Sequence, residues 1–189
     1  MEIMEKATQI KSCGIQKLDL SLWKMIQKTC QQNIEDGIIK FKLTPELAKT
    51  IALMPDEQMH SLTSNIVLSF KNDFSEERVK SIIANESSDK SFFIGDEYIS
   101  INPINLYYWQ SLHKLSALDV SIAKICFGVS LNFTQMIATA DHNHLLNIAQ
   151  KIPMNYRIRA RLSSILKIAA SNNVAHKKNC MLQKIHQSI

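Results

Sequence analysis

The chain has 189 residues, of which 46% are apolar, and its 22 Lys and Arg against 17 Asp and Glu give a net charge of +5. No apolar run reaches the length of roughly 18 residues that a transmembrane helix needs, so no membrane insertion is expected. With only four Gly and four Pro, the composition excludes a collagen-like or low-complexity chain. The length allows one domain or two small ones.

The N-terminal segment and the cysteines indicate the compartment. Residues 1–14 lack a long apolar centre and do not resemble a secretory signal. No two of the four cysteines have C-x-x-C spacing, and Cys30 and Cys126 fall within helical periodicity, where cysteine behaves as a small apolar residue. A disulfide framework is not expected. We therefore expect a reduced, cytoplasmic protein.

The first half of the chain is predicted to be mainly helical. Apolar residues recur every three or four positions from Leu22 to Phe41, which predicts one long amphipathic helix, loosened at Gly37. Thr44 is a good N-cap for the next helix, and Pro45 suits its first position. The further elements predicted here are helices at Thr44–Met54 and Pro55–Asn65, a β-rich segment at Ile66–Phe70, and a helix at Glu76–Asn85 capped by Ser75.

The second half begins after a polar linker at residues 86–91. Two short β-type runs, Phe92–Ile94 and Tyr98–Ile101, flank Gly95 and predict a small β-hairpin. The elements predicted after it are helices at Ile104–Phe127, Leu131–Ala140, His142–Ile152 and Ile158–Ala170, followed by a basic tail at Ser171–Ile189. The expected fold class is therefore all-α, with one short β-hairpin.

An internal repeat relates the two halves. Trp109 lies 86 residues after Trp23, and with this offset residues 18–71 align with residues 104–157 without a gap. Apolar positions and helix-cap positions agree along the alignment, although two unrelated helical segments could also match by chance. Repetition of this kind decides the architecture. The sequence predicts repeat one at 1–86, a linker with the hairpin at 87–103, repeat two at 104–171 and a basic tail at 172–189, with the repeats packed as a pseudo-dimer.

The charge is distributed unevenly. No Asp or Glu follows Asp141, whereas eight Lys and Arg do, and the first 141 residues carry a net negative charge. Such an imbalance points to a polyanionic partner for the basic end, and the alternative is a solvated helix face. The residues predicted to contact DNA phosphates are Lys151, Arg157, Arg159, Arg161, Lys167, Lys177 and Lys178.

The sequence contains no motif that predicts catalysis or a bound cofactor. It has no glycine-rich phosphate loop, no G-x-S-x-G and no H-E-x-x-H. The segment Asp141–His144 is the one local cluster of possible ligands, but two histidines two residues apart do not share a helix face, and the segment is better explained as a helix start. We expect a non-enzymatic protein without metal, and an enzyme would need a site assembled only in three dimensions.

Each half also contains a pair of short helices with a tight junction, at Thr44–Asn65 and Ser130–Lys151. This is the layout of a helix-turn-helix, although any small helical domain can show it. The second helix of the first pair begins with Pro55-Asp56-Glu57, which disfavours DNA. The second helix of the other pair presents side chains that could contact bases or phosphates, or could simply be solvated: His142, Asn143, His144, Asn147, Gln150 and Lys151.

The first repeat resembles the FlhD family, the small subunit of the flagellar master activator. The resemblance is carried by F-K-L-T-P-E-L-A-K-T-I-A-L-M-P-D-E-Q-M-H-S-L-T-S-N at residues 41–65 and by the extended segment that ends at Phe70-Lys71. The second repeat is similar through Phe127-Gly128-Val129, Met136-Ile137-Ala138 and Tyr156-Arg157. The resemblance covers about residues 18–86 and 104–171, and its motifs are apolar helix patterns.

The resemblance implies an all-α protein whose two halves correspond to an intimate FlhD dimer, and which joins a zinc-binding, FlhC-like subunit to activate promoters. Two departures matter. The cysteine that can link FlhD protomers falls on Leu68 and Met154, so no such bridge is implied. The partner's four-cysteine zinc site is absent from this sequence.

The sequence thus favours a regulatory subunit that binds a protein partner and, within that complex, DNA. The alternative is an adaptor or assembly subunit of a secretion or conjugation machine, which uses the same fold for protein contacts alone. In that case the basic end would meet an acidic protein surface.

Overall fold

The computed structural model describes residues 14–63, 67–86, 101–159 and 165. Within these residues the chain is mainly helical and contains a single two-stranded sheet, which confirms the predicted all-α class. The elements are α2 (Ile15–Gln32), α3 (Ile34–Phe41), α4 (Pro45–Leu53), α5 (Asp56–Leu62), β1 (Phe70–Asn72), α6 (Glu76–Glu86), α7 (Pro103–Leu118), α8 (Val120–Phe127), α9 (Leu131–Ala138), α10 (His142–Lys151) and β2 (Tyr156–Ile158).

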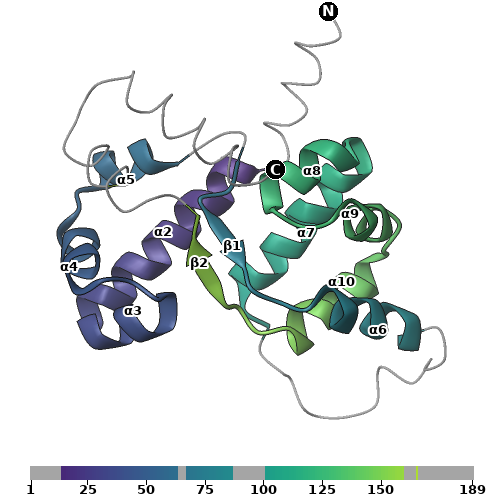
Figure 1. Ribbon diagram of the computed structural model, residues 1–189, viewed down its shortest axis with the longest axis horizontal. Helices are drawn as coiled ribbons and strands as arrows, with labels where there is room; N and C mark the ends of the chain where they lie inside the picture. Colours follow the sequence, from purple (N-terminus) through teal and green to yellow (C-terminus); the bar gives the residue numbers. More distant parts are fainter. Residues whose placement is uncertain (1–13, 64–66, 87–100, 160–164, 166–189) are drawn as a thin grey trace, which may run out of the picture.

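Helices α2 and α7 pack against each other at the centre of the molecule (Figure 1). Helices α3, α4 and α5 contact α2, whereas α8, α9 and α10 contact α7. Strands β1 and β2 lie side by side over the centre, and α6, which follows β1, packs against α10 of the other half (Figure 1). The segment from β1 to α6 therefore crosses from one half to the other.

The two long predicted helices are each broken in two, which corrects the sequence analysis. The breaks lie at Asn33 and Asp119, whose backbones are extended (φ −154° and −159°). The Asn33 side chain accepts a hydrogen bond from the Glu35 amide, and the Asp119 side chain accepts from the Ser121 and Ile122 amides. Each residue therefore serves as the N-cap of a new helix, and this local bonding outweighs the continuous apolar periodicity.

The predicted loosening at Gly37 is also wrong, because Gly37 lies inside α3. Its α-carbon faces Cys30 of α2, and a β-carbon at this position would collide with the Cys30 Sγ. Gly37 thus allows α3 to fold back closely onto α2. The helix predicted from Ile158 is corrected at its start, since Tyr156–Ile158 forms β2. The predicted β-hairpin and most of the last helix lie outside the described residues.

Both tryptophans are buried, Trp23 on α2 and Trp109 on α7. Trp23 packs edge-on against Phe70 with 4.7 Å between ring centroids. Trp109 packs against Phe74, at 4.9 Å, and its indole N–H donates to Asn105. Since Phe74 follows β1, an aromatic side chain of the first half contributes to the core of the second.

Candidate nucleic-acid interface

The β1–β2 ribbon presents two cations side by side. The strands are antiparallel, with Phe70 opposite Ile158, Lys71 opposite Arg157 and Asn72 opposite Tyr156. Residues that face each other across such a pair share one side of the sheet, and alternate residues share the other. Phe70, Asn72 and Tyr156 are buried. Lys71 and Arg157 therefore lie on the outer face.

One carboxylate, that of Asp73, forms ion pairs with two cations at this outer face. The Arg157 Nε lies 3.2 Å from Asp73 Oδ1, and the Lys42 Nζ lies 3.8 Å from Asp73 Oδ2. The side chains of Arg157 and Lys42 are 52% and 64% exposed. For Lys71 no ion pair is found within the described part of the chain. We call Lys42, Lys71 and Arg157, with Asp73, the ribbon cluster, which holds three positive charges and one negative.

Arg159 has a different role from the one predicted. Its guanidinium donates to the carbonyls of Cys126 (2.8 Å), Ile125 (3.2 Å) and Leu68 (3.4 Å). The first two carbonyls belong to the last turn of α8, where backbone acceptors have no partner within the helix. Burial lowers the pKa of Arg159 from its usual value. Arg159 is thus a C-terminal cap that fastens β2 to α8, and it is not available for phosphate.

Of the other predicted phosphate contacts, the structure describes Lys151 alone. Lys151 is exposed at the end of α10, and its carbonyl accepts a hydrogen bond from Arg78 of α6. Arg161, Lys167, Lys177 and Lys178 lie outside the described residues. Among the predicted contacts that the structure describes, Arg157 alone joins the ribbon cluster. Sequence reasoning missed Lys42 and Lys71 because they belong to the half with net negative charge, although Lys71 aligns with Arg157 under the repeat offset.

The second helix-turn-helix candidate, α9–α10, offers fewer polar contacts than its sequence predicts. Asn147 is buried. His144 is engaged in a capping box, in which its amide donates to Asp141 and its ring accepts from the Asp141 amide. The hydrogen bond from the His144 amide is the main cause of the lowered pKa of Asp141. Since α10 also packs against α6 and α7, the exposed part of the predicted face is reduced chiefly to His142, Asn143 and Lys151.

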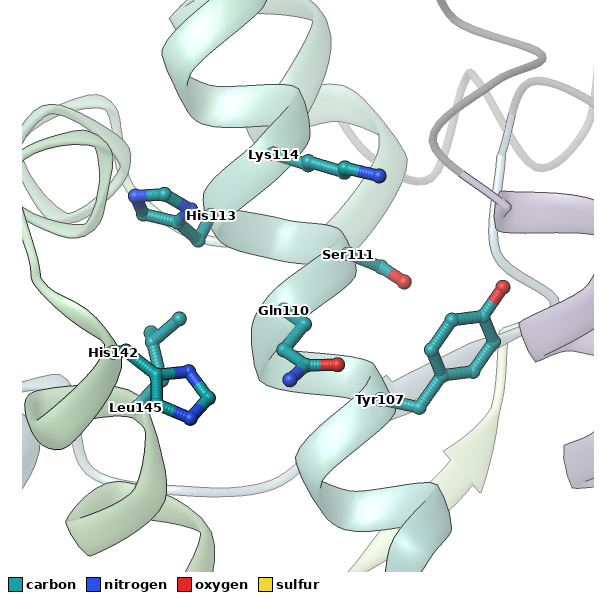
Figure 2. Close-up of a pocket in the computed structure, with 7 residues that line it drawn as sticks. All are labelled: Tyr107, Gln110, Ser111, His113, Lys114, His142 and Leu145. Carbon is teal, nitrogen blue, oxygen red and sulfur yellow. The ribbon is translucent and has the colours of Figure 1, made fainter.

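A groove of about 360 Å³ is lined by residues of α7 and α10. Figure 2 shows Tyr107, Ser111 and Lys114 to one side of the helix and His113 and His142 to the other. The Tyr107 hydroxyl donates to the Gly14 carbonyl at 3.2 Å, whereas the buried Ser111 hydroxyl finds no hydrogen-bond partner among the described residues. The seven residues that line the groove include no carboxylate, so neither histidine meets an orienting acid there: Tyr107, Gln110, Ser111, His113, Lys114, His142 and Leu145.

Comparison of the chain with protein-family models, with curated proteins and with solved structures finds no match. Among the described residues, no group of three or more His, Cys, Asp or Glu is placed to hold a metal ion. No single described helix is long and apolar enough to cross a membrane, and α8 with α9 passes such a test only as a pair bent by 116°.

Proposed function

We propose that the chain is a non-enzymatic regulatory subunit, similar to FlhD, in which two copies of one helical fold form a pseudo-dimer that binds a protein partner and, with it, DNA. The register of the β1–β2 ribbon carries the proposal. With the offset of 86 residues, Phe70 and Tyr156 are counterparts, as are Asn72 and Ile158. Phe70 pairs with Ile158, which is the counterpart of Asn72, and Asn72 pairs with Tyr156, which is the counterpart of Phe70. Between them, Lys71 pairs with its own counterpart, Arg157. A two-fold axis through the central pair produces this register.

The element boundaries support the same relationship. The bounds of α3 and α8 differ by 86 residues at both ends, and so do those of β1 and β2. The tryptophan-bearing helices have equivalent neighbours, since α2 contacts α3, α4 and α5, and α7 contacts α8, α9 and α10. Two hydrogen bonds across the halves are also counterparts, from the Asp73 amide to the Asn155 carbonyl and from the Arg159 amide to the Ser69 carbonyl.

Two highly exposed aliphatic side chains favour a protein partner. Ile39 on α3 is 77% exposed and Leu53 at the end of α4 is 84% exposed. Helices α3 and α4 pack against each other, and exposed apolar side chains that gather on one surface mark protein contacts. The observation also fits the alternative function, an adaptor of a secretion or conjugation machine that makes protein contacts alone.

A pull-down from the native host combined with a gel-shift titration tests the proposal. We expect the chain to co-purify with a cysteine-rich, FlhC-like protein, and the complex to bind duplex DNA with an affinity that falls steeply as salt rises. Co-purification with membrane ATPase or channel components, together with no DNA binding at low salt, would overturn the regulatory proposal in favour of the adaptor.

A further inference from the structure

We infer that the outer face of the β1–β2 ribbon is the surface that contacts the phosphate backbone of DNA, through Lys71, Arg157 and Lys42. This inference rests on the proposed function and moves the DNA contact from the C-terminal end, where the sequence places it, to the junction of the two halves. Three properties of the ribbon support this assignment: its arrangement of charge, its rigidity and its symmetry.

The arrangement of charge is unfavourable for the chain alone. Like charges directly opposite each other on neighbouring strands repel, yet Lys71 faces Arg157 across the ribbon. Asp73 contacts Arg157 and Lys42, which leaves the ribbon cluster with a net charge of +2 from three cations and one carboxylate. A local rule that is broken in this way often marks a functional site. A polyanion supplies the missing negative charge.

The ribbon is held in place before any ligand binds. Asn72 accepts a hydrogen bond from the Asn155 amide at 3.0 Å, and the Arg159 amide donates to Ser69 at 2.9 Å. The Arg159 guanidinium fixes the end of β2 to α8, and the Leu68 amide donates to Cys126 of the same helix. Binding therefore orders few backbone groups, which lowers its entropic cost.

The symmetry of the ribbon suits duplex DNA. The central pair, Lys71 and Arg157, lies where the proposed two-fold axis leaves the protein, so one cation from each half faces outward there. Two-fold symmetric proteins commonly place such an axis on the pseudo-two-fold axis of the duplex. Contacts to phosphate position the protein without selecting a base sequence.

Charge variants in the full chain, purified with its partner where one is found, test the inference by gel shift across salt concentrations. Lys71→Gln/Arg157→Gln should weaken binding to all duplexes alike and flatten the log–log salt slope by about 2 units, at about 0.9 per lost phosphate contact. Lys28→Gln/Lys49→Gln is the matched control, because it removes the same charge from exposed positions of α2 and α4. The control should leave that slope unchanged.

Asp73→Asn provides a test of opposite sign. Removal of the only carboxylate of the ribbon cluster releases Arg157 and Lys42, so this variant should bind DNA more tightly than the wild type and show a steeper salt slope. A purely structural role of the cluster predicts weaker binding or no change. Far-UV circular dichroism checks that each variant is folded. If Lys71→Gln/Arg157→Gln does not fold, the DNA affinity of Asp73→Asn decides whether the ribbon inference holds.

The outcomes separate the inference from the proposed function. If the wild type binds DNA and both ribbon variants bind as it does, the ribbon inference is overturned while the regulatory proposal stands. If the wild type, alone and with its partner, binds no DNA at low salt, both are overturned. Binding to poly-glutamate but not to DNA would also overturn the inference and assign the ribbon to an acidic protein surface.

Discussion

At the scale of single residues, basic side chains of this chain have different roles that depend on their contacts. Arg157 and Arg159 are two residues apart, and both are predicted phosphate contacts. The Arg157 side chain is half exposed and pairs with Asp73, whereas the Arg159 guanidinium is bonded to three backbone carbonyls. Sequence pattern cannot separate these roles, because the acceptors of Arg159 come from residues more than 30 positions away.

The two arginines should therefore respond differently to substitution. Arg159→Ala leaves carbonyls at the end of α8 without their donor, and we expect the free energy of unfolding to fall by about 2 kcal/mol, in the range for hydrogen bonds to charged groups. Arg157→Ala removes an exposed ion pair and should cost under about 1 kcal/mol. Urea unfolding of both variants measures the difference. Equal stabilities would contradict the capping role of Arg159.

The tryptophans should act through stability. Trp23 and Trp109 are both buried. Trp23 packs against Phe70, which lies in β1, and Trp109 packs against Phe74, which follows β1. Truncation of either indole to Ala should lower the free energy of unfolding by roughly 3–5 kcal/mol. The corresponding Phe variants fill much of the space and should lose less. Thermal unfolding provides the measurement, and an unchanged melting temperature for Trp23→Ala would contradict its burial in the folded chain.

At the scale of elements, helix starts were largely predictable and helix breaks were not. Thr44 and Ser130 accept hydrogen bonds from the amides of Leu47 and Phe133, as their residue type predicts. The helix breaks at Asn33 and Asp119 fall within a continuous pattern of apolar residues, so the periodicity does not reveal them. Strand β2 was missed because three residues are too few to show an alternating pattern. Of the ribbon cluster, the sequence predicts Arg157 alone, because Lys71 meets it through pairing between distant strands and Lys42 joins the cluster through Asp73.

The close packing of α3 on α2 gives a test at this scale. Gly37→Ala should destabilise the protein by about 1–3 kcal/mol, because the new methyl group meets Cys30. In Gly37→Ala/Cys30→Ala the obstructing sulfur is gone, so the double variant should lose less than the sum of the two single changes. A double-mutant cycle from denaturant unfolding measures this coupling. Additive losses would mean that Gly37 and Cys30 do not touch.

At the scale of the whole molecule, the halves are joined by more than the ribbon. Glu76 of α6 accepts from the amide and hydroxyl of Ser130, the N-cap of α9, with 2.8 Å and 2.5 Å between the bonded atoms. Phe74 lies between Trp109 and Phe133 of the second half. The first half therefore supplies a hydrogen-bond acceptor for the N-cap residue of α9 and a core side chain to the second half, which does not contain its whole core.

Separate fragments of residues 1–86 and 87–189 should accordingly fold poorly alone and associate when mixed. We expect the helical circular dichroism of an equimolar mixture to exceed the sum of the separate spectra, with a 1:1 complex by analytical ultracentrifugation. A mixture of fragment 87–189 with the Phe74→Ala/Glu76→Ala variant of fragment 1–86 is the control, because it removes the crossing contacts to Ser130, Trp109 and Phe133. If each fragment unfolds cooperatively alone and mixing changes nothing, the crossing contacts do not hold the molecule together.

The two ends of the ribbon carry different residues, which is impossible in a symmetric homodimer. Under the proposed repeat, Asp73 and Arg159 are counterparts, yet one is an acid beside the ribbon cations and the other a base turned toward α8. Two identical subunits must carry the same residue at both places, and they leave a symmetric ligand free to bind either way round. Under that repeat, one chain carries different residues at the two ends of the ribbon, so the two ends are not equivalent. Under the proposed DNA contact, a duplex bound across the ribbon would therefore have a single preferred orientation, and its two directions would be distinguished.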